Sequence, residues 1–224
     1  MSTGQDSHAT YDQNYTEYQT RRSAWRRWLR RYYLDRAASL TKGPALDFGC
    51  GVGELLKRLP SGSMGLEYNP ASVDHCRRMG LDVSEYDGFL DDFSLQSVDW
   101  RGRVNTLFLS HVLEHFEDPM HVLRRLAHSV ADGIRRIVVI VPGRAGFRID
   151  PTHRTHVDLA MLETTFKELP GWMISSSQYF PLNACRAGDF FPYNELQVVI
   201  DRLQTNPDTA QLPTHPLSRS ETHT

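Results

Sequence analysis

The sequence predicts an α/β fold: a doubly wound, mostly parallel sheet with helices on both faces. Short apolar runs alternate with amphipathic segments along the chain, as expected when helices cover a parallel sheet. The first apolar run, residues 44–48, breaks into a turn with three alternating glycines. No internal repeat interrupts the pattern, and 224 residues suffice for one sizeable core. We therefore expect a single Rossmann-like domain.

The elements follow from the same pattern, taken in chain order. Seven strands are predicted, the last two as a hairpin, at residues 44–48, 63–67, 82–86, 104–110, 135–141, 172–179 and 196–202. Helices are predicted at residues 53–59, 71–79, 89–95, 119–130 and 159–169. The helix that begins at Pro119 has a clear start signal, because Asp118 can cap its free N–H groups and proline fits the first turn.

Residues 14–40 are predicted to form an N-terminal cap helix. Trp25, Trp28 and Tyr32 recur at helical spacing, and arginines flank them. We favour an aromatic stripe that packs on the sheet with solvated arginines; a basic helix on an anionic membrane or phosphate-bearing ligand is the alternative. The polar segments 1–13 and 205–224 are predicted to be disordered tails, which leaves 41–204 as the domain.

The glycine turn and the acids around it predict a nucleoside cofactor. The alternating glycines allow the backbone to approach a ligand closely. Glu67 ends the second strand at the spacing of a carboxylate that accepts hydrogen bonds from ribose hydroxyls. A dinucleotide fingerprint requires glycine where this chain has Glu54, and a carboxylate there would repel a pyrophosphate. Together with Asp47, the turn therefore favours S-adenosylmethionine, which is cationic and carries no phosphate, over NAD.

Three segments of the chain, residues 46–53, 65–70 and 109–119, have the order and spacing of a known set of motifs. They resemble the glycine motif, the acidic motif and the segment after the fourth strand of class I S-adenosylmethionine-dependent methyltransferases, the group that includes ubiquinone-biosynthesis, natural-product and sugar methyltransferases. The similarity extends over residues 40–145. It implies methyl transfer to a small-molecule acceptor. The chain departs from the family at Asn105, where members commonly carry an aspartate that supports structure.

The strand ends and the resemblance together predict the cofactor contacts. These are Asp47, Gly49, Cys50, Gly51, Gly53, Glu67, Tyr68, Asp87, Gly88, Ser110 and His111. Asp47 and the glycine backbone are expected at the methionine portion, Glu67 at the ribose and Tyr68 against adenine. Asp87 resembles the family's acid that accepts a hydrogen bond from the adenine amino group. An equally supported alternative is that Asp87 is a turn residue before Gly88. The resemblance also implies an aromatic residue over the cofactor, at Tyr11, Tyr15 or Tyr18.

Two histidines in the third motif are candidates for chemistry. His111 and His115 lie four residues apart with Glu114 between them, a spacing that metals use, but no third ligand is evident and we expect no metal site. Methyl transfer mainly needs alignment, and a base is required only where the acceptor starts as a neutral hydroxyl. His115 is the first candidate base, with a structural role as an equal alternative.

The loop at residues 142–156 is the main substrate-side feature. It has no helical or strand period and follows the fifth strand, whose carboxyl end faces the expected site. Its basic residues predict a pocket for an anionic or carboxylated acceptor. The expected contacts are Arg144, Arg148, Arg154 and His156, with His153 as an alternative base. The competing interpretation is a solvated surface in which Asp150 pairs with a neighbouring arginine.

Composition limits the other function classes. A net charge of −2 and the lack of an Asn-Pro-Pro-aromatic tetrad argue against nucleic acid. No apolar run spans a bilayer and the polar N-terminus is no signal peptide, so we expect no stable membrane insertion, a cytoplasmic location and unpaired thiols. A homodimer is compatible with the sequence. The favoured function is methylation of a hydroxyl, or less readily an amine; the alternative is a catalytically silent cofactor-binding partner or regulatory protein.

Overall fold

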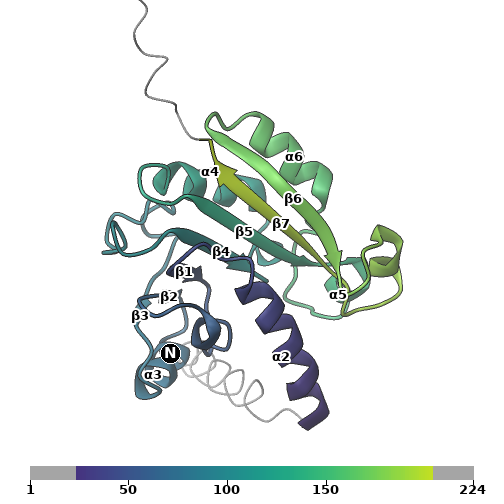
Figure 1. Cartoon of the computed structure of the whole chain (residues 1–224), viewed down its shortest axis with the longest axis horizontal. Helices are drawn as coiled ribbons and strands as arrows, with labels where there is room; N and C mark the ends of the chain where they lie inside the picture. The colour runs from purple at the N-terminus through teal and green to yellow at the C-terminus, as the bar shows by residue number, and fades with distance from the viewer. Residues whose placement is uncertain (1–23, 204–224) are drawn as a thin grey trace, which may run out of the picture.

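A seven-stranded sheet forms the centre of the molecule and confirms the predicted fold class (Figure 1). The computed structural model describes residues 24–203, and their side chains from residue 30 onward. The strands are β1 Ala45–Phe48, β2 Met64–Glu67, β3 Val83–Glu85, β4 Thr106–Ser110, β5 Arg136–Pro142, β6 Trp172–Phe180 and β7 Glu195–Arg202. Each lies within two residues of its predicted bounds.

The strand order is β3-β2-β1-β4-β5-β7-β6. The first five strands run parallel, whereas β7 is antiparallel to both β5 and β6. Strands β2 and β3 therefore lie on one side of β1, and the strands from β4 onward lie on its other side. Ligands of such sheets bind beyond the carboxyl ends of the strands at this switch point. The carboxyl ends of β1 and β4, Phe48 and Ser110, therefore mark where a site is expected.

Helices lie between several of the strands, and three of them begin at a side-chain cap, Asn69, Asp118 or Asp158. The helices are α2 Ala24–Ala38, α3 Pro70–Arg78, α4 Pro119–Ser129, α5 Arg144–Phe147 and α6 Leu159–Lys167, with 3₁₀ turns η1 Leu56–Arg58, η2 Leu113–His115 and η3 Cys185–Asp189. Asp118 caps α4 as predicted, accepting from the backbone N–H of His121 at 2.9 Å. Within residues 24–203, no helix is long and apolar enough to cross a membrane. Residues 1–23 and 204–224, which include both predicted tails and Tyr11, Tyr15 and Tyr18, lie outside the described part of the chain.

Three local predictions were wrong. The segment predicted as a helix at 53–59 forms only η1, because it spans too few residues between Gly53 and Pro60 to repay helix nucleation. Residues 89–95, also predicted as helix, form turns in which Asp92 and Phe93 adopt φ values of 50° and 56°. The loop at 142–156, predicted to be irregular, contains the short helix α5 at its start.

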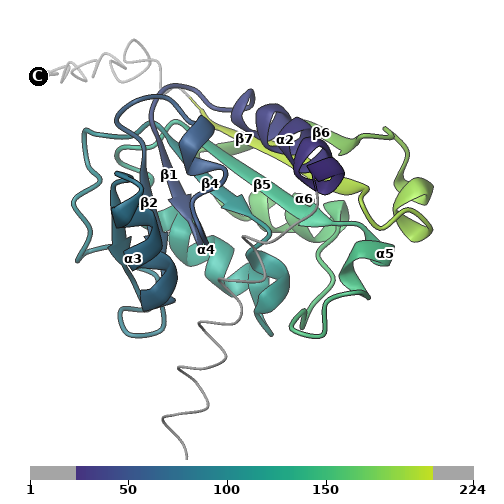
Figure 2. The ribbon, with the colours of Figure 1, turned by 90° about the horizontal axis from the view of Figure 1, so that it is seen from below.

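Helices cover both faces of the sheet (Figure 2). On one face, α2 and α3 supply Leu34 and Val73 to a cluster that includes Phe108 of β4. On the other face, α4 and α6 supply residues to a larger cluster that includes Leu107 and Leu109, the two neighbours of Phe108. Adjacent residues of one strand thus point into different halves of the core, as the period of two requires.

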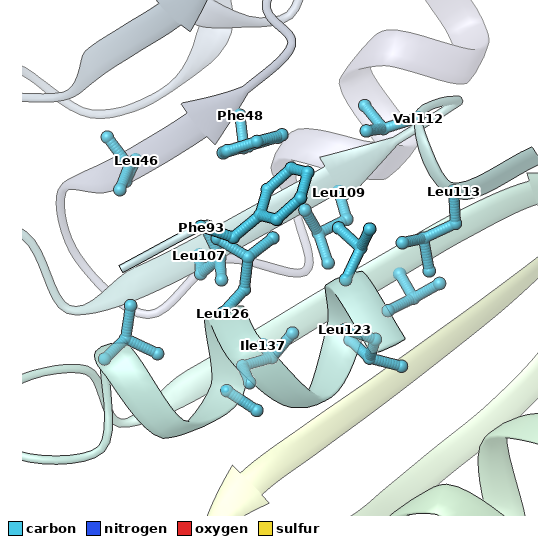
Figure 3. Packing of buried hydrophobic residues seen from close by; sticks show 14 of the residues in the cluster. Leu46, Phe48, Phe93, Leu107, Leu109, Val112, Leu113, Leu123, Leu126 and Ile137 are labelled. Atoms are coloured by element: carbon cyan, nitrogen blue, oxygen red, sulfur yellow. The ribbon is translucent and has the colours of Figure 1, made fainter. Parts of the chain in front are cut away.

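The larger cluster packs α4 against the parallel half of the sheet (Figure 3). Leu123 and Leu126 of α4 lie against Leu107 and Leu109, and all four side chains are fully buried. Phe93, from the turns before β4, closes the same cluster near Phe48 with ring centroids 6.3 Å apart. Because both faces are sealed by apolar packing, polar chemistry is confined to the edge where the strands end.

One ion pair locks the antiparallel strand to the parallel part. Arg136 of β5 and Asp201 of β7 are register partners, and their side chains pair at two points, with N···O distances of 2.8 and 2.9 Å. The same guanidinium donates to the carbonyl oxygen of Leu40 at 2.9 Å, so it also holds the end of the α2 segment. These contacts with Arg136 lower the pKa of Asp201 to about 2.

We expect Asp201→Asn to lower the free energy of unfolding by about 1–3 kcal/mol at pH 7, because it removes charge-assisted hydrogen bonds. The folded-state pKa is depressed, so this stabilisation is present above about pH 4 and is lost as the pH falls through about 2. Urea unfolding at pH 7 and pH 2 measures it, with Asp74→Asn on the exposed side of α3 as the control. An equal loss at both pH values would contradict the assignment.

Candidate active site

The turn after β1 adopts the conformation that its glycines permit. Gly49, Gly51 and Gly53 have φ values of 70°, 55° and 74°, in the left-handed region. The backbone N–H groups of Gly49 and Cys50 donate to the carbonyl oxygen of Leu66 in β2, at 2.8 and 3.0 Å. A Cβ atom on Gly49 would lie 2.8 Å from Cγ2 of Val112, so a larger residue would also push the segment after β4. The turn is therefore fixed in shape between β1 and β2.

Asp47 lies under this turn and is almost completely buried, with 2 % of its surface exposed. Its Oδ2 atom has no hydrogen-bond partner among the described residues. Burial, followed by the charge of Glu67 and the neighbouring Cys76 thiol, raises the pKa of Asp47 to about 8. A positively charged ligand group beside Asp47 would offset the cost of ionising it.

Glu67 ends β2 and points back to the turn. Its carboxylate accepts from the N–H of Gly51 at 2.7 Å and from the N–H of Asn69 at 2.9 Å. Each carboxylate oxygen can accept more than one hydrogen bond, so these backbone contacts orient Glu67 without exhausting it. Tyr68 follows with 66 % of its surface exposed. An exposed aromatic ring beside an oriented carboxylate suits a nucleoside.

Asp87 and Gly88 follow β3 in a tight turn. The carboxylate of Asp87 accepts from the N–H of Phe89 at 2.9 Å, which is the contact expected of a turn residue. Gly88 is packed against the ring of Phe93, which leaves no space for a side chain. Phe89 is 74 % exposed and touches Phe93 and Phe116. These rings form an aromatic wall next to the ends of β1 and β4.

His111 follows Ser110 at the end of β4, with a φ of 55° that is unusual for a non-glycine residue. Its ring lies between two buried acids, with Nδ1 3.3 Å from Oε1 of Glu114 and Nε2 3.1 Å from Oε2 of Glu195. Exclusion of water by surrounding atoms would lower its pKa, but the two carboxylates outweigh this and raise the pKa of His111 to about 10. We therefore treat His111 as an imidazolium that neutralises acids at the strand ends.

Glu114, His115 and His153 form a cluster beside His111. One ligand-type atom of each lies within 4.8 Å of the others. The rings of His115 and His153 are 4.9 Å apart, and Nε2 of His153 is 3.9 Å from Oε1 of Glu114. The structure thus brings together the two residues predicted as alternative bases.

Glu114 and Glu195 were missed by sequence reasoning. Glu114 sits inside a recognised motif, yet η2 turns its side chain into the interior, where it is fully buried. Glu195 lies opposite Pro142 at the start of β7, on an antiparallel strand far away in sequence. The position of Glu114 between His111 and His115 was the sequence signal that could have identified it as a site residue. No local signal identified Glu195.

The predicted substrate residues are only partly brought together. Arg144 and Arg148 are exposed on α5 and just after it, and Arg144 lies 3.8 Å from Asp189. His156 packs edge-on against Phe147 at 5.5 Å; burial first, and then Arg144, lower its pKa. Arg154 reaches the site through its backbone, whose N–H donates to the carbonyl oxygen of Glu114 at 2.7 Å, while its side chain is exposed.

Helix α2 holds the glycine turn from outside. Arg30 forms an ion pair with Glu54, and Arg58 of η1 pairs with Asp35 at 2.9 Å. Glu54, the residue that argued against a dinucleotide, therefore already has a cationic partner. Tyr32, predicted in the aromatic stripe, contacts the ring of Phe180 in β6 at 5.0 Å and remains half exposed.

Comparison with known proteins gives the family. A family model described as a methyltransferase domain matches residues 16–181. A search of curated proteins found no match.

Solved structures share the fold at low sequence identity. A methyltransferase from Archaeoglobus fulgidus, described as S-adenosylmethionine-dependent, is 20% identical, with a TM-score of 0.59 over 79% of this chain and 94% of that one. Magnesium protoporphyrin IX methyltransferase from Synechocystis, solved with S-adenosylhomocysteine, is 16% identical, with a TM-score of 0.52 over 77% and 80%. A putative methyltransferase of Haloferax volcanii, in complex with the Trm112 activator, is 15% identical, with a TM-score of 0.57 over 78% and 91%. The chain therefore belongs to the methyltransferase-domain family and has the fold of class I S-adenosylmethionine-dependent methyltransferases.

Proposed function

We propose that this domain transfers the methyl group of S-adenosylmethionine to a hydroxyl of a small, anionic acceptor. The observation that carries the proposal is the pair of acids at the glycine turn, Asp47 and Glu67. A buried carboxyl with an unpartnered oxygen and an oriented carboxylate beside it favour a ligand with a positive charge and sugar hydroxyls. A phosphate in the same place would be repelled.

The cofactor supplies an electrophilic methyl group on a sulfonium, and the chain supplies its orientation. We assign Asp47 and the backbone of Gly49 and Gly51 to the methionine portion. Glu67 is assigned to the two ribose hydroxyls. The rings of Tyr68 and Phe89 would flank the adenine, where a planar apolar group matches their exposed faces. Ser110 and His111, at the end of β4, complete this side of the site.

We assign the acceptor to the part of the site that Glu114, His115 and His153 form. The neighbouring atoms that exclude water, together with His153, lower the pKa of His115, although Glu114 and Asp150 act in the opposite direction. A neutral imidazole can take a proton from a hydroxyl as the methyl group is transferred. His115 is the first candidate base and His153 the second. An amine acceptor that is already neutral would need neither.

The anionic group of the acceptor is assigned to Arg144, Arg148 and His156. The two arginines are exposed at the start of the loop, on α5 and just after it. Their charges help to lower the pKa of His156. Among the described residues, the ion-pair partner of Arg144 is Asp189 at 3.8 Å, so its exposed guanidinium can still bind a carboxylate or phosphate. Arg154 is left as a peripheral contact. A silent cofactor-binding protein remains the alternative, and it would bind S-adenosylmethionine without turning over any acceptor.

Glu67→Ala is expected to weaken binding of S-adenosylhomocysteine by about 5- to 150-fold, because charge-assisted hydrogen bonds worth roughly 1–3 kcal/mol are lost. Isothermal titration calorimetry measures the change. Glu85→Ala is the matched control, because Glu85 is the register partner of Glu67 on β3 and is exposed. Equal affinities of Glu67→Ala and wild type would remove Glu67 from the site.

Asp47→Asn is expected to be more stable than the wild type at pH 8 and to lose this advantage toward pH 4. The folded-state pKa of Asp47 is raised, so its protonated form favours folding at low pH and that contribution disappears as the pH rises through about 8. Asparagine keeps the neutral form at every pH. Chemical unfolding at pH 4, 6 and 8 measures the difference.

The same variant tests the ligand charge. Because a cationic cofactor favours ionised Asp47, wild-type affinity for S-adenosylmethionine should rise between pH 6 and pH 8.5, whereas Asp47→Asn should bind weakly with little pH dependence. A wild-type affinity that falls over this range would count against a cation beside Asp47.

His115→Ala is expected to reduce kcat by about 10²- to 10⁴-fold while affinity for the cofactor stays unchanged, as for the loss of a general base. Steady-state assays with carboxylated phenols or sugars measure kcat, and calorimetry measures the affinity for the cofactor. His128→Ala, exposed at the end of α4, is the control. A loss seen in His153→Ala but not in His115→Ala would assign the base to His153.

A further inference from the structure

We propose that Glu114, His115 and His153 are the ligand set of one divalent cation of the Zn²⁺ type, bound at the acceptor side of the site. Binding of the cation stands on the geometry of these residues alone. Its role in catalysis rests on the methyl transfer proposed above. Sequence alone argued against a metal, because the pair considered was His111 and His115 and no third ligand was visible.

The distances are those of a slightly open site. Ligand-type atoms of all three residues lie within 4.8 Å of one another, and Oε1 of Glu114 is 3.9 Å from Nε2 of His153. Around a tetrahedral Zn²⁺ with bonds of 2.0–2.2 Å, ligand atoms would be about 3.4 Å apart. A closure of roughly 1 Å, within reach of side-chain rotation, would therefore complete the site.

Hydrogen bonds fix the tautomers of both histidines. Nδ1 of His153 lies 2.9 Å from the carbonyl oxygen of Phe147, which can only accept, so Nδ1 carries the proton. The hydroxyl of Thr152 donates to Asp150 at 2.6 Å, so its oxygen accepts from Nδ1 of His115 at 3.2 Å. Both histidines therefore keep the lone pair on Nε2. Holding the outer nitrogen in this way is the usual support of a metal-binding histidine.

Glu114 supplies a buried carboxylate whose neighbour is the ring of His111, with Nδ1 3.3 Å from Oε1. It is fully buried, and neither of its oxygens has a hydrogen-bond partner among the described residues. A buried carboxylate is costly, and the ring of His111 contacts Oε1 alone, so coordination of a cation would satisfy the rest of the group. The carbonyl oxygen of Glu114 accepts from the N–H groups of Arg154 and Thr155 at 2.7 and 3.2 Å. The backbone thus ties η2 to the loop that carries His153.

The surrounding charge permits a cation despite His111. Its Nδ1 lies 3.3 Å from Glu114 and competes for the same oxygen, but the ring pairs with Glu195 through Nε2 and would keep that partner. Asp150 adds a carboxylate 4.0 Å from Nε2 of His153. Glu195 and Asp150 thus add two further carboxyl groups next to the three proposed ligands.

The ligand types select the cation. Two imidazoles and one carboxylate suit Zn²⁺, Co²⁺ or Mn²⁺, whereas Mg²⁺ and Ca²⁺ prefer oxygen ligands. Three protein ligands leave a position open, as in catalytic sites. An acceptor hydroxyl bound there would lose its proton to solvent at lower pH. The oxygen–methyl bond then forms as the sulfur–methyl bond breaks. With the cation bound, His115 and His153 would act as ligands, and solvent would take the proton that His115 takes in the metal-free reaction proposed above.

Calorimetry on the full chain, freed of metal by a chelator and then dialysed, tests the proposal. We expect Zn²⁺ to bind at one site per chain, and Co²⁺ to bind there with a visible absorption band. His153→Ala should weaken binding at least as much as the 10- to 100-fold cost of losing an outer-sphere partner. Glu114→Gln should do the same, with thermal melting as the check on folding. His128→Ala and Cys185→Ser are the controls, because both side chains are exposed and outside the cluster.

Thr152→Val provides a finer test. It removes the acceptor of Nδ1 of His115 and should weaken Co²⁺ binding, and Thr152→Ser should restore it. Absence of Zn²⁺ and Co²⁺ binding by the wild type, or equal binding by His153→Ala, would overturn the site. Titration of S-adenosylhomocysteine into the metal-free protein runs in parallel. Cofactor binding without metal binding refutes only this inference, and metal binding without cofactor binding refutes only the proposed function.

Discussion

The burial of carboxyl groups at the carboxyl edge of the sheet is the constraint on which this architecture depends. Helices seal both faces of the parallel strands, so the chain can expose polar groups to a ligand only where the strands end. Asp47 and Glu114 lie at that edge and are 2 % and 0 % exposed. A charge removed from water in this way must be neutralised or paired. The edge is consequently built to receive positive charge.

The two acids meet this constraint differently. Among residues 24–203, no cationic side chain pairs with Asp47, and burial raises its pKa to about 8. Glu114 has the imidazolium of His111 at 3.3 Å, shared with Glu195. Asp47, on the side that we propose for the cofactor, would therefore gain a counter-ion from the ligand, while Glu114 already has part of its compensation in His111.

The fold was largely predictable because its signals are local. The β-strands are apolar runs that end at polar or turn residues. Asp118 and Pro119 predict the start of α4 from their capping chemistry alone. The errors at residues 53–59 and 89–95 have the same origin, because short amphipathic stretches resemble helices until tertiary packing sets Phe93 in a left-handed conformation. Motif spacing also singled out Asp47 and Glu67, which the structure brings to the glycine turn and which we propose as cofactor contacts. Glu195 and the contact between His115 and His153 were not predictable in this way, because they join segments separated by tens of residues and depend on how β7 and the loop after β5 fold back.

Helix α2 connects halves of the molecule that the sheet keeps apart. Arg30 forms an ion pair with Glu54 of the glycine turn. On the other side, the hydroxyl of Tyr33 donates to the carbonyl oxygen of Tyr193 at 2.8 Å, and Nε of Arg36 donates to Oε1 of Gln197 in β7 at 3.2 Å. Helix α2 thus contacts both the glycine turn after β1 and the chain around the start of β7, where Glu195 lies. A substitution that shifts α2 would therefore disturb the glycine turn and the start of β7 together.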